Sequence, residues 1–161
     1  MPGRSVATTV TLLAFVVACS SPAPTSPEAS VSSPTVACRG VTASVVSTAF
    51  GASASGPNPA PAEDSCGFTL ADSAGQRAGS VEVRHHAYRW DLDAERRAHL
   101  DGRTIPGVGH GAFWWSGGTL GILIAVRDGE TIEIRVYDLT NGATDVAIAA
   151  AGIARAALSS G

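Results

Sequence analysis

The sequence predicts an α+β domain in which an antiparallel sheet of about five strands carries helices packed mainly on one face, in the order α-β-β-α-β-β-β-α. Three observations predict this fold. Residues 119–127 and 131–138 alternate apolar and polar side chains around Asp128-Gly129, a dipeptide typical of two-residue hairpin turns. Residues 65–71 and 80–88 alternate in the same way, as half-buried strands do. Three further segments follow residues that commonly cap helices.

The first predicted helix is Ala43–Phe50, which Thr42 can cap at its start and Gly51 can end. Its apolar face comprises Val45, Val46, Ala49 and Phe50. Residues 51–64, with the sequence GASASGPNPAPAED, are expected to form a loop because they are rich in Gly, Pro and Ser.

Two strands and a short helix are expected next. The first strand, 65–71, points Cys66, Phe68 and Leu70 inward, and the second, 80–88, points Val81 and Val83 inward.

The helix at 92–100 begins after the capping residue Asp91 and ends at Gly102. We expect it to be mostly exposed because its apolar stripe is thin, and to carry an Asp93–Arg97 pair at i,i+4 spacing.

The hairpin and a last helix complete the domain. We expect the apolar residues of the two hairpin strands to lie opposite one another. These are Leu120, Ile122, Ile124 and Val126 in the first strand and Ile132, Ile134 and Val136 in the second. Leu123 and Ala125 make the strand at 119–127 apolar on its second face too, which indicates a central strand. Thr144 is expected to cap a helix running to about Leu158, with its sheet-facing side formed by Val146, Ala150, Ile153 and Ala157.

The amino terminus predicts export and lipid anchoring. Residues 6–18 form an apolar run after a single Arg, too short to cross a bilayer as a stable helix, so residues 1–18 are interpreted as a signal peptide. The sequence Val16-Val17-Ala18-Cys19 resembles the lipobox of bacterial lipoproteins, which implies cleavage after Ala18 and acylation of Cys19. The alternative is an ordinary signal peptide followed by a chance cysteine. The expected location is the outer face of the cell membrane, with the lipid on Cys19 as the membrane contact.

Residues 19–37 are expected to be an extended tether, because they are rich in Ser, Pro, Ala and Thr and lack apolar periodicity. At roughly 3.1 Å per residue the tether reaches up to about 55 Å from the membrane. The folded domain then comprises residues 38–161.

Charge and cysteine content narrow the possible functions. The chain has a formal net charge of −3, which is unfavourable for binding nucleic acid. With Cys19 assigned to the lipid, Cys38 and Cys66 remain as a disulfide pair in an oxidising environment. A redox-active pair would more often be closely spaced, as in Cys-x-x-Cys.

No catalytic, metal or cofactor site is predicted. His85 and His86 are adjacent on a strand and point to opposite faces, and the four histidines show no metal-ligand spacing. The glycine-rich residues 107–111 lack the following helix that a phosphate loop needs, so a turn is expected there. There is no Gly-x-Ser-x-Gly motif, and no cysteine is left for nucleophilic chemistry. The protein is therefore not expected to be an enzyme.

The aromatic residues give the one candidate binding surface, formed by Tyr88, Trp90, Trp114 and Trp115. On a strand, Phe113 and Trp115 share one face and Trp114 takes the other, so an exposed ring could be a platform for sugar, lipid or protein. The alternative is that these rings close the ends of a small core.

The chain resembles a family of uncharacterised actinobacterial secreted lipoproteins. The resemblance rests on the lipobox and Ser/Pro tether, on Cys38 before a short helix in 41–51, on the second cysteine in 65–68, and on the glycine-rich turn and aromatic residue in 107–113. It implies the same anchor, disulfide and fold, and it implies no activity.

These observations favour a non-enzymatic binding or accessory module of the cell envelope, with an envelope protein or glycolipid as its partner. The alternative is a carrier that holds a small molecule or lipid in a cavity between the sheet and the helices.

Overall fold

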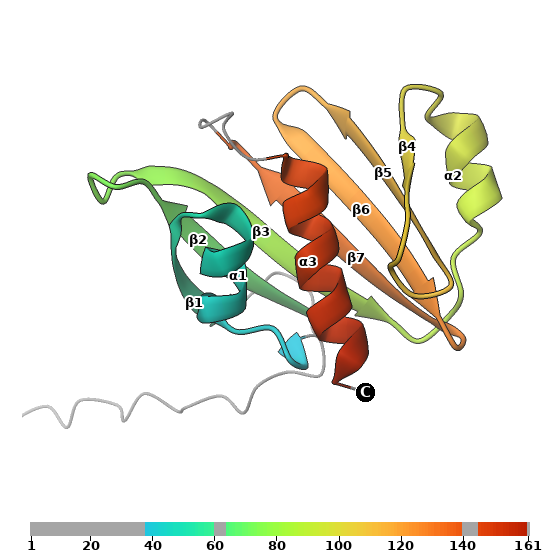
Figure 1. Ribbon diagram of the computed structural model, residues 1–161, viewed down its shortest axis with the longest axis horizontal. Helices are drawn as coiled ribbons and strands as arrows, with labels where there is room; N and C mark the ends of the chain where they lie inside the picture. Colours follow the sequence, from blue (N-terminus) through green and yellow to red (C-terminus); the bar gives the residue numbers. More distant parts are fainter. Residues whose placement is uncertain (1–37, 60–63, 140–144, 161) are drawn as a thin grey trace, which may run out of the picture. The chain divides into compact units, whose positions relative to one another are not determined.

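The computed structural model of the chain describes residues 38–59, 64–139 and 145–160. One antiparallel sheet contains seven strands in the order β1-β2-β3-β7-β6-β5-β4 (Figure 1). The strands are β1 (Ser53–Pro59), β2 (Ser65–Ala71), β3 (Arg77–His86), β4 (Arg103–Ile105), β5 (Gly111–Gly117), β6 (Leu120–Arg127) and β7 (Glu130–Tyr137). The helices are α1 (Ala43–Phe50), α2 (Leu92–Ala98) and α3 (Val146–Ser159). The α+β class is confirmed, but the sheet has seven strands and not about five, and the expected order α-β-β-α-β-β-β-α is wrong because a strand is added before each of the two strand runs.

Helices α1 and α3 cover the same face of the sheet, as Figure 1 shows. Helix α3 is rich in alanine, and it packs against β6 and β7 on one side and against α1 on the other. Small side chains allow helix and sheet to approach closely. Ala150 and Ile153 are fully buried, as expected. The core of the domain therefore lies between these two helices and one face of the sheet.

The facing of the β6–β7 hairpin differs from our expectation. Arg127 pairs with Glu130 across the Asp128-Gly129 turn, and this register places Ile132 opposite Ala125 and Ile134 opposite Leu123. Arg135 lies opposite Ile122, and Glu133 lies opposite Ile124. The expected apposition of the two apolar sets is wrong, because a two-residue turn allows only one register and both faces of β6 are apolar.

Strand β1 forms where a loop was expected. Its sequence, SASGPNP, has low strand propensity, yet it pairs with β2 along the edge of the sheet, with a register shift between Ser55 and Asn58. Proline is tolerated at a sheet edge because the side of the strand that faces away from the sheet has no ladder bonds to lose. The second additional strand, β4, has three residues and pairs with β5.

The helix ends also differ in detail. Asp145 caps α3 by accepting hydrogen bonds from the backbone N–H groups of Ala147 and Ile148, whereas Thr144 had been expected in this role and lies outside the described residues. Helix α1 has the predicted cap, Thr42, and the predicted stop, Gly51. Helix α2 begins after Asp91 as expected and ends at Ala98, two residues early.

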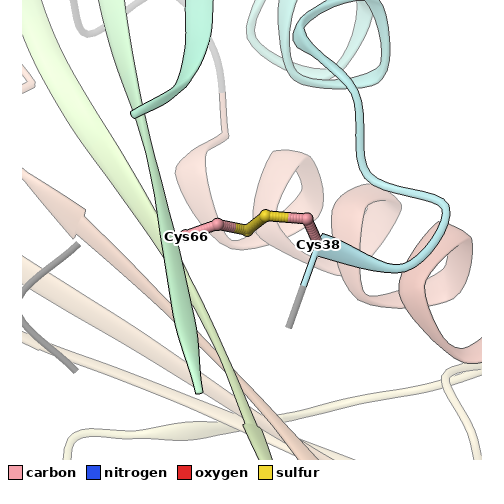
Figure 2. Close-up of a disulfide and its surroundings, with 2 residues drawn as sticks. All are labelled: Cys38 and Cys66. Carbon is pink, nitrogen blue, oxygen red and sulfur yellow. A yellow bond between two sulfur atoms is a disulfide. The ribbon is translucent and has the colours of Figure 1, made fainter. Parts of the chain in front are cut away.

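The predicted disulfide is present. Cys38 and Cys66 are 28 residues apart in the sequence, with their Cα atoms 5.8 Å apart, and the bond ties the segment before α1 to strand β2 (Figure 2). Closing a loop of this length in the unfolded chain corresponds to about 3–4 kcal/mol of stabilisation.

In the part of the chain that the structure describes, no helix has both the length and the apolar character needed to cross a membrane. The signal peptide, Cys19 and the tether at 19–37 lie outside the described residues, so these predictions stay predictions.

Candidate functional site

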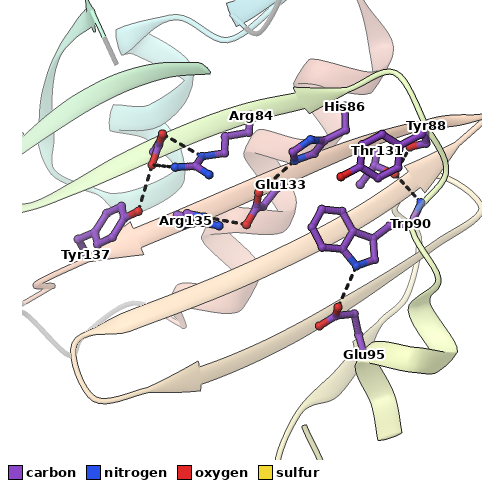
Figure 3. A network of polar contacts seen from close by, with 10 residues as sticks. Arg84, His86, Tyr88, Trp90, Glu95, Thr131, Glu133, Arg135 and Tyr137 are labelled. Carbon is purple, nitrogen blue, oxygen red and sulfur yellow. Dashed lines mark hydrogen bonds and ion pairs between the residues drawn. The ribbon is translucent and has the colours of Figure 1, made fainter. Parts of the chain in front are cut away.

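The face of the sheet opposite α1 and α3, here called the open face, is polar along β3 and β7. The alternation that buries Val81 and Val83 under the helices turns Glu82, Arg84 and His86 to the open face. Across the ladder, β7 contributes Glu133 and Arg135 to the same face, as Figure 3 shows.

Glu133 is the centre of one group of polar contacts. Its side chain is only 3 % exposed, with Oε1 accepting a 2.7 Å hydrogen bond from Arg135 Nε and Oε2 lying 3.1 Å from His86 Nε2. A buried carboxylate is costly unless both oxygens have partners. For Arg135, burial lowers the pKa of the guanidinium, but the bonds to Glu133 and Tyr137 outweigh burial and raise it.

Glu82 forms a second group of contacts beside the first. Arg84 donates to both of its oxygens, at 2.9 and 3.2 Å, and the Tyr137 hydroxyl donates to Oε2 at 3.0 Å. Burial raises the pKa of the Glu82 carboxyl, but these bonds, together with one from Ser65, outweigh burial and hold the pKa below its usual value near 4.5. Each of the two carboxylates is therefore fixed in place by one arginine and by further polar side chains.

Three rings gather where β3 ends and the chain crosses to α2. His86 lies 5.3 Å from Tyr88 and 5.2 Å from Trp90 between ring centroids, and the rings of Tyr88 and Trp90 are 5.9 Å apart and tilted by 30°. Tyr88 is 54 % exposed, and Trp90 is half-buried. We call these three residues the ring cluster.

Hydrogen bonds from two other elements hold the ring cluster in position (Figure 3). Thr131 of β7 is fully buried; its hydroxyl accepts from the Trp90 backbone N–H at 2.9 Å and donates to the Tyr88 carbonyl at 2.7 Å. The Trp90 indole N–H donates to Glu95 of α2 at 2.8 Å. The backbone on both sides of the crossover is thus attached to the sheet, and the indole is attached to the helix.

The four aromatic residues of the predicted surface lie in three places. Tyr88 and Trp90 are together, as expected. Trp115 is also on the open face, where its ring stacks on His99 at 3.8 Å between centroids. Trp114 points the other way, as the strand alternation predicted, and at 8 % exposed it belongs to the core under α3. The candidate surface therefore excludes Trp114.

A polar pocket of about 380 Å³ adjoins the ring cluster and shares Trp90 with it. The titratable residues that line it are Arg89, Asp91, Asp93, Arg96 and His110. The expected Asp93–Arg97 pair is wrong. Asp93 pairs with Arg96, three residues later, and Arg97 lies 3.8 Å from Asp91.

A second cavity, of about 420 Å³, lies beside the start of α3, where β5 and β7 end and β6 begins. Its apolar lining comprises Trp114, Leu120, Val136, Leu139, Val146 and Ala147. Leu139 and Asp145, which both line this cavity, border residues 140–144, which lie outside the described residues.

Each histidine lies beside a different carboxylate, with pairs His85–Glu130, His86–Glu133, His99–Glu95 and His110–Asp128. Across the described ranges, no group of three or more His, Cys, Asp or Glu side chains is placed to hold a metal ion.

Sequence reasoning missed the partners that organise this site. Glu133 and Thr131 come from β7, more than 40 residues after β3, and no local pattern says that these two strands pair. Thr131 reads as an ordinary strand residue, and its two bonds to the crossover depend on that pairing. The sequence places Glu133 and Arg135 two positions apart on the polar side of an alternating strand, and this spacing alone does not distinguish a buried ion pair from exposed charges.

Comparison of the chain with models of known protein families, with curated proteins and with solved structures gives no match. The resemblance to secreted lipoproteins therefore stays a prediction from the sequence motifs.

We predict that Thr131→Val destabilises the domain by about 1–3 kcal/mol, because the Trp90 N–H and the Tyr88 carbonyl both lose their partner. Thr131→Ser, which keeps the hydroxyl, should lose clearly less. Urea unfolding followed by tryptophan fluorescence measures both. Equal stability of Thr131→Val and the wild type would show that the hydroxyl does not hold the crossover.

We also predict a pH-dependent effect of Glu82→Gln. Because the folded-state pKa of Glu82 lies below about 4.5, the ionised carboxylate stabilises the fold above that pH, and this contribution is lost as the pH falls through the folded-state pKa. The difference in unfolding free energy between wild type and variant should be largest at neutral pH and shrink in acid. Tyr137→Phe, which removes one of the bonds, should show a smaller effect of the same sign. A difference that stays constant with pH would refute this assignment.

Proposed function

We propose that the domain is a non-enzymatic binding module, held at the outer face of the cell membrane through a lipid on Cys19, and that the ring cluster on the open face contacts its partner. The proposal for the membrane rests on the lipobox-like residues 16–19 and the tether at 19–37. The proposal for the contact surface rests on the ring cluster.

The single observation that carries this proposal is that the Tyr88 ring is exposed while its backbone carbonyl is held by a hydrogen bond from the buried Thr131 hydroxyl. A large ring that is 54 % exposed loses apolar contact with the rest of the protein, and such rings are common where a partner covers them. The Thr131 bonds keep the crossover ordered before binding, which lowers the entropy lost on association.

The charged groups beneath the ring cluster favour a binding role over a catalytic one. Both oxygens of Glu133 face cationic or polar partners, and those of Glu82 do too. Carboxylates held in this way stiffen the face of the sheet. An acid or base that must exchange protons with a substrate needs an oxygen open to it.

A carrier is the second candidate, and the cavity beside Trp114 favours it. About 420 Å³ with a mainly apolar lining lies within the range of small-molecule sites, about 300–1,000 Å³. A carrier purified from its host should release a bound small molecule on denaturation, detectable by mass spectrometry.

The binding-module proposal is tested in the native host with a photo-cross-linking amino acid at position 88. The matched control is position 148, an apolar residue that is 62 % exposed on α3, over the other face of the sheet. We expect a membrane-bound protein with an acyl-sized mass increment, cross-linked to an envelope component from position 88 and not from position 148. The Cys19→Ser variant should be released from the membrane.

Two outcomes would contradict the proposal, one for the lipid anchor and one for the contact surface. A wild-type protein that is soluble and lacks the mass increment rules out the anchor. Equal cross-linking from the two positions, or none from position 88, rules out the ring cluster as the contact surface.

A further inference from the structure

The polar pocket beside Trp90 has a composition that selects among ligand classes. Its lining combines a half-buried indole ring with cationic donors and carboxylate acceptors. Two arginines and two aspartates line it, so their formal charges cancel, and His110 faces Asp128 at 2.8 Å. Since acidic and basic side chains line the pocket in equal number and both aspartates already lie beside an arginine, the pocket favours a ligand held mainly by hydrogen bonds and ring contact.

Donors and acceptors placed around an aromatic ring match the chemistry of a sugar. A pyranose presents C–H groups on its face, which pack on an aromatic ring, and hydroxyls around its rim, each of which can both donate and accept a hydrogen bond. The tilt of 30° between Tyr88 and Trp90 offers ring surface beyond the pocket itself. We propose that Trp90, Tyr88 and this pocket bind a neutral pyranose oligosaccharide. This inference rests on the proposed binding function and names its ligand class.

Arg89 is the free hydrogen-bonding group of the site. It is exposed at the pocket, between Tyr88 and Trp90 in the sequence, and makes no hydrogen bond or ion pair with any residue in the described ranges. Arg96 is already paired with Asp93. A guanidinium has five donors in a planar fork, so Arg89 can reach two adjacent hydroxyls of one sugar ring.

The short helix α2 positions the site and adds no net charge to it, because its two charged pocket residues, Asp93 and Arg96, pair with each other. The side chain of Asp91 already accepts hydrogen bonds from the backbone N–H groups of Asp93 and Ala94. Glu95 holds the Trp90 indole N–H at 2.8 Å, which fixes the plane of the ring at the pocket wall. The volume of about 380 Å³ is near the lower end of the range for small-molecule sites, which fits a short stretch of sugar and not a long chain.

The test uses nuclear magnetic resonance of the three tryptophan indole N–H groups in the full chain carrying Cys19→Ser, prepared under oxidising conditions. The probes are maltohexaose, cellohexaose and chitohexaose, each added to about 10 mM, which detects dissociation constants in the millimolar range. We expect at least one probe to shift the Trp90 signal while the core residue Trp114 stays unchanged.

Two variants assign the binding to this site. Tyr88→Ala removes an exposed ring and keeps the backbone carbonyl that Thr131 uses, and Arg89→Ala removes an unpaired side chain, so both should fold. We expect each to weaken binding of the responsive oligosaccharide about tenfold, a change typical of a principal contact residue. Ile148→Ala, on α3, should bind as the wild type does.

The proposal is overturned if no oligosaccharide shifts the Trp90 signal, or if Tyr88→Ala and Arg89→Ala bind with unchanged affinity. Cross-linking from position 88 to an envelope protein without any response to sugar would leave the binding function standing and reject the carbohydrate. Sugar binding by a chain that is not membrane-bound would reject the anchor and keep the carbohydrate.

Discussion

The turn at Asp128-Gly129 is the constraint on which the rest of the structure depends. Both of its residues have positive φ, 50° and 88°, as a tight hairpin turn of this length requires. With two residues in the turn, Arg127 must pair with Glu130, and every later pair of β6 and β7 follows from that one. A slip of one residue would exchange the two faces of β7 completely.

That register decides which chemistry appears on each face. Ile132 and Ile134 go under α3 with Leu123 and Ala125, and the alanine-rich helix packs onto them. Glu133 and Arg135 go to the open face, where β3 supplies His86 as a further partner. Thr131 follows the same alternation, so its hydroxyl reaches the crossover that carries Tyr88 and Trp90, and the proposed binding surface depends on the turn.

Local patterns predicted the elements better than they predicted the contacts between them. Helix α1 and strand β2 were predicted with the bounds that the structure has, because caps and alternation are local. Strand β1 was missed since its Gly, Pro and Ser residues oppose strand formation, and its pairing with β2 is a tertiary effect. The facing of the hairpin was wrong although the turn length implied it, because apolar residues on both faces of β6 conceal which face is the core.

The candidate site shows the same division. The aromatic residues Tyr88 and Trp90 are visible in the sequence, but Thr131 and Glu133 become their neighbours only through the pairing of β3 with β7.

The most direct measurement is therefore a set of nuclear Overhauser effects between Hα protons across the hairpin. We predict cross peaks from Ile124 to Glu133 and from Ile122 to Arg135. Cross peaks from Ile124 to Ile132 or Ile134 would contradict the register, and with it the polar open face.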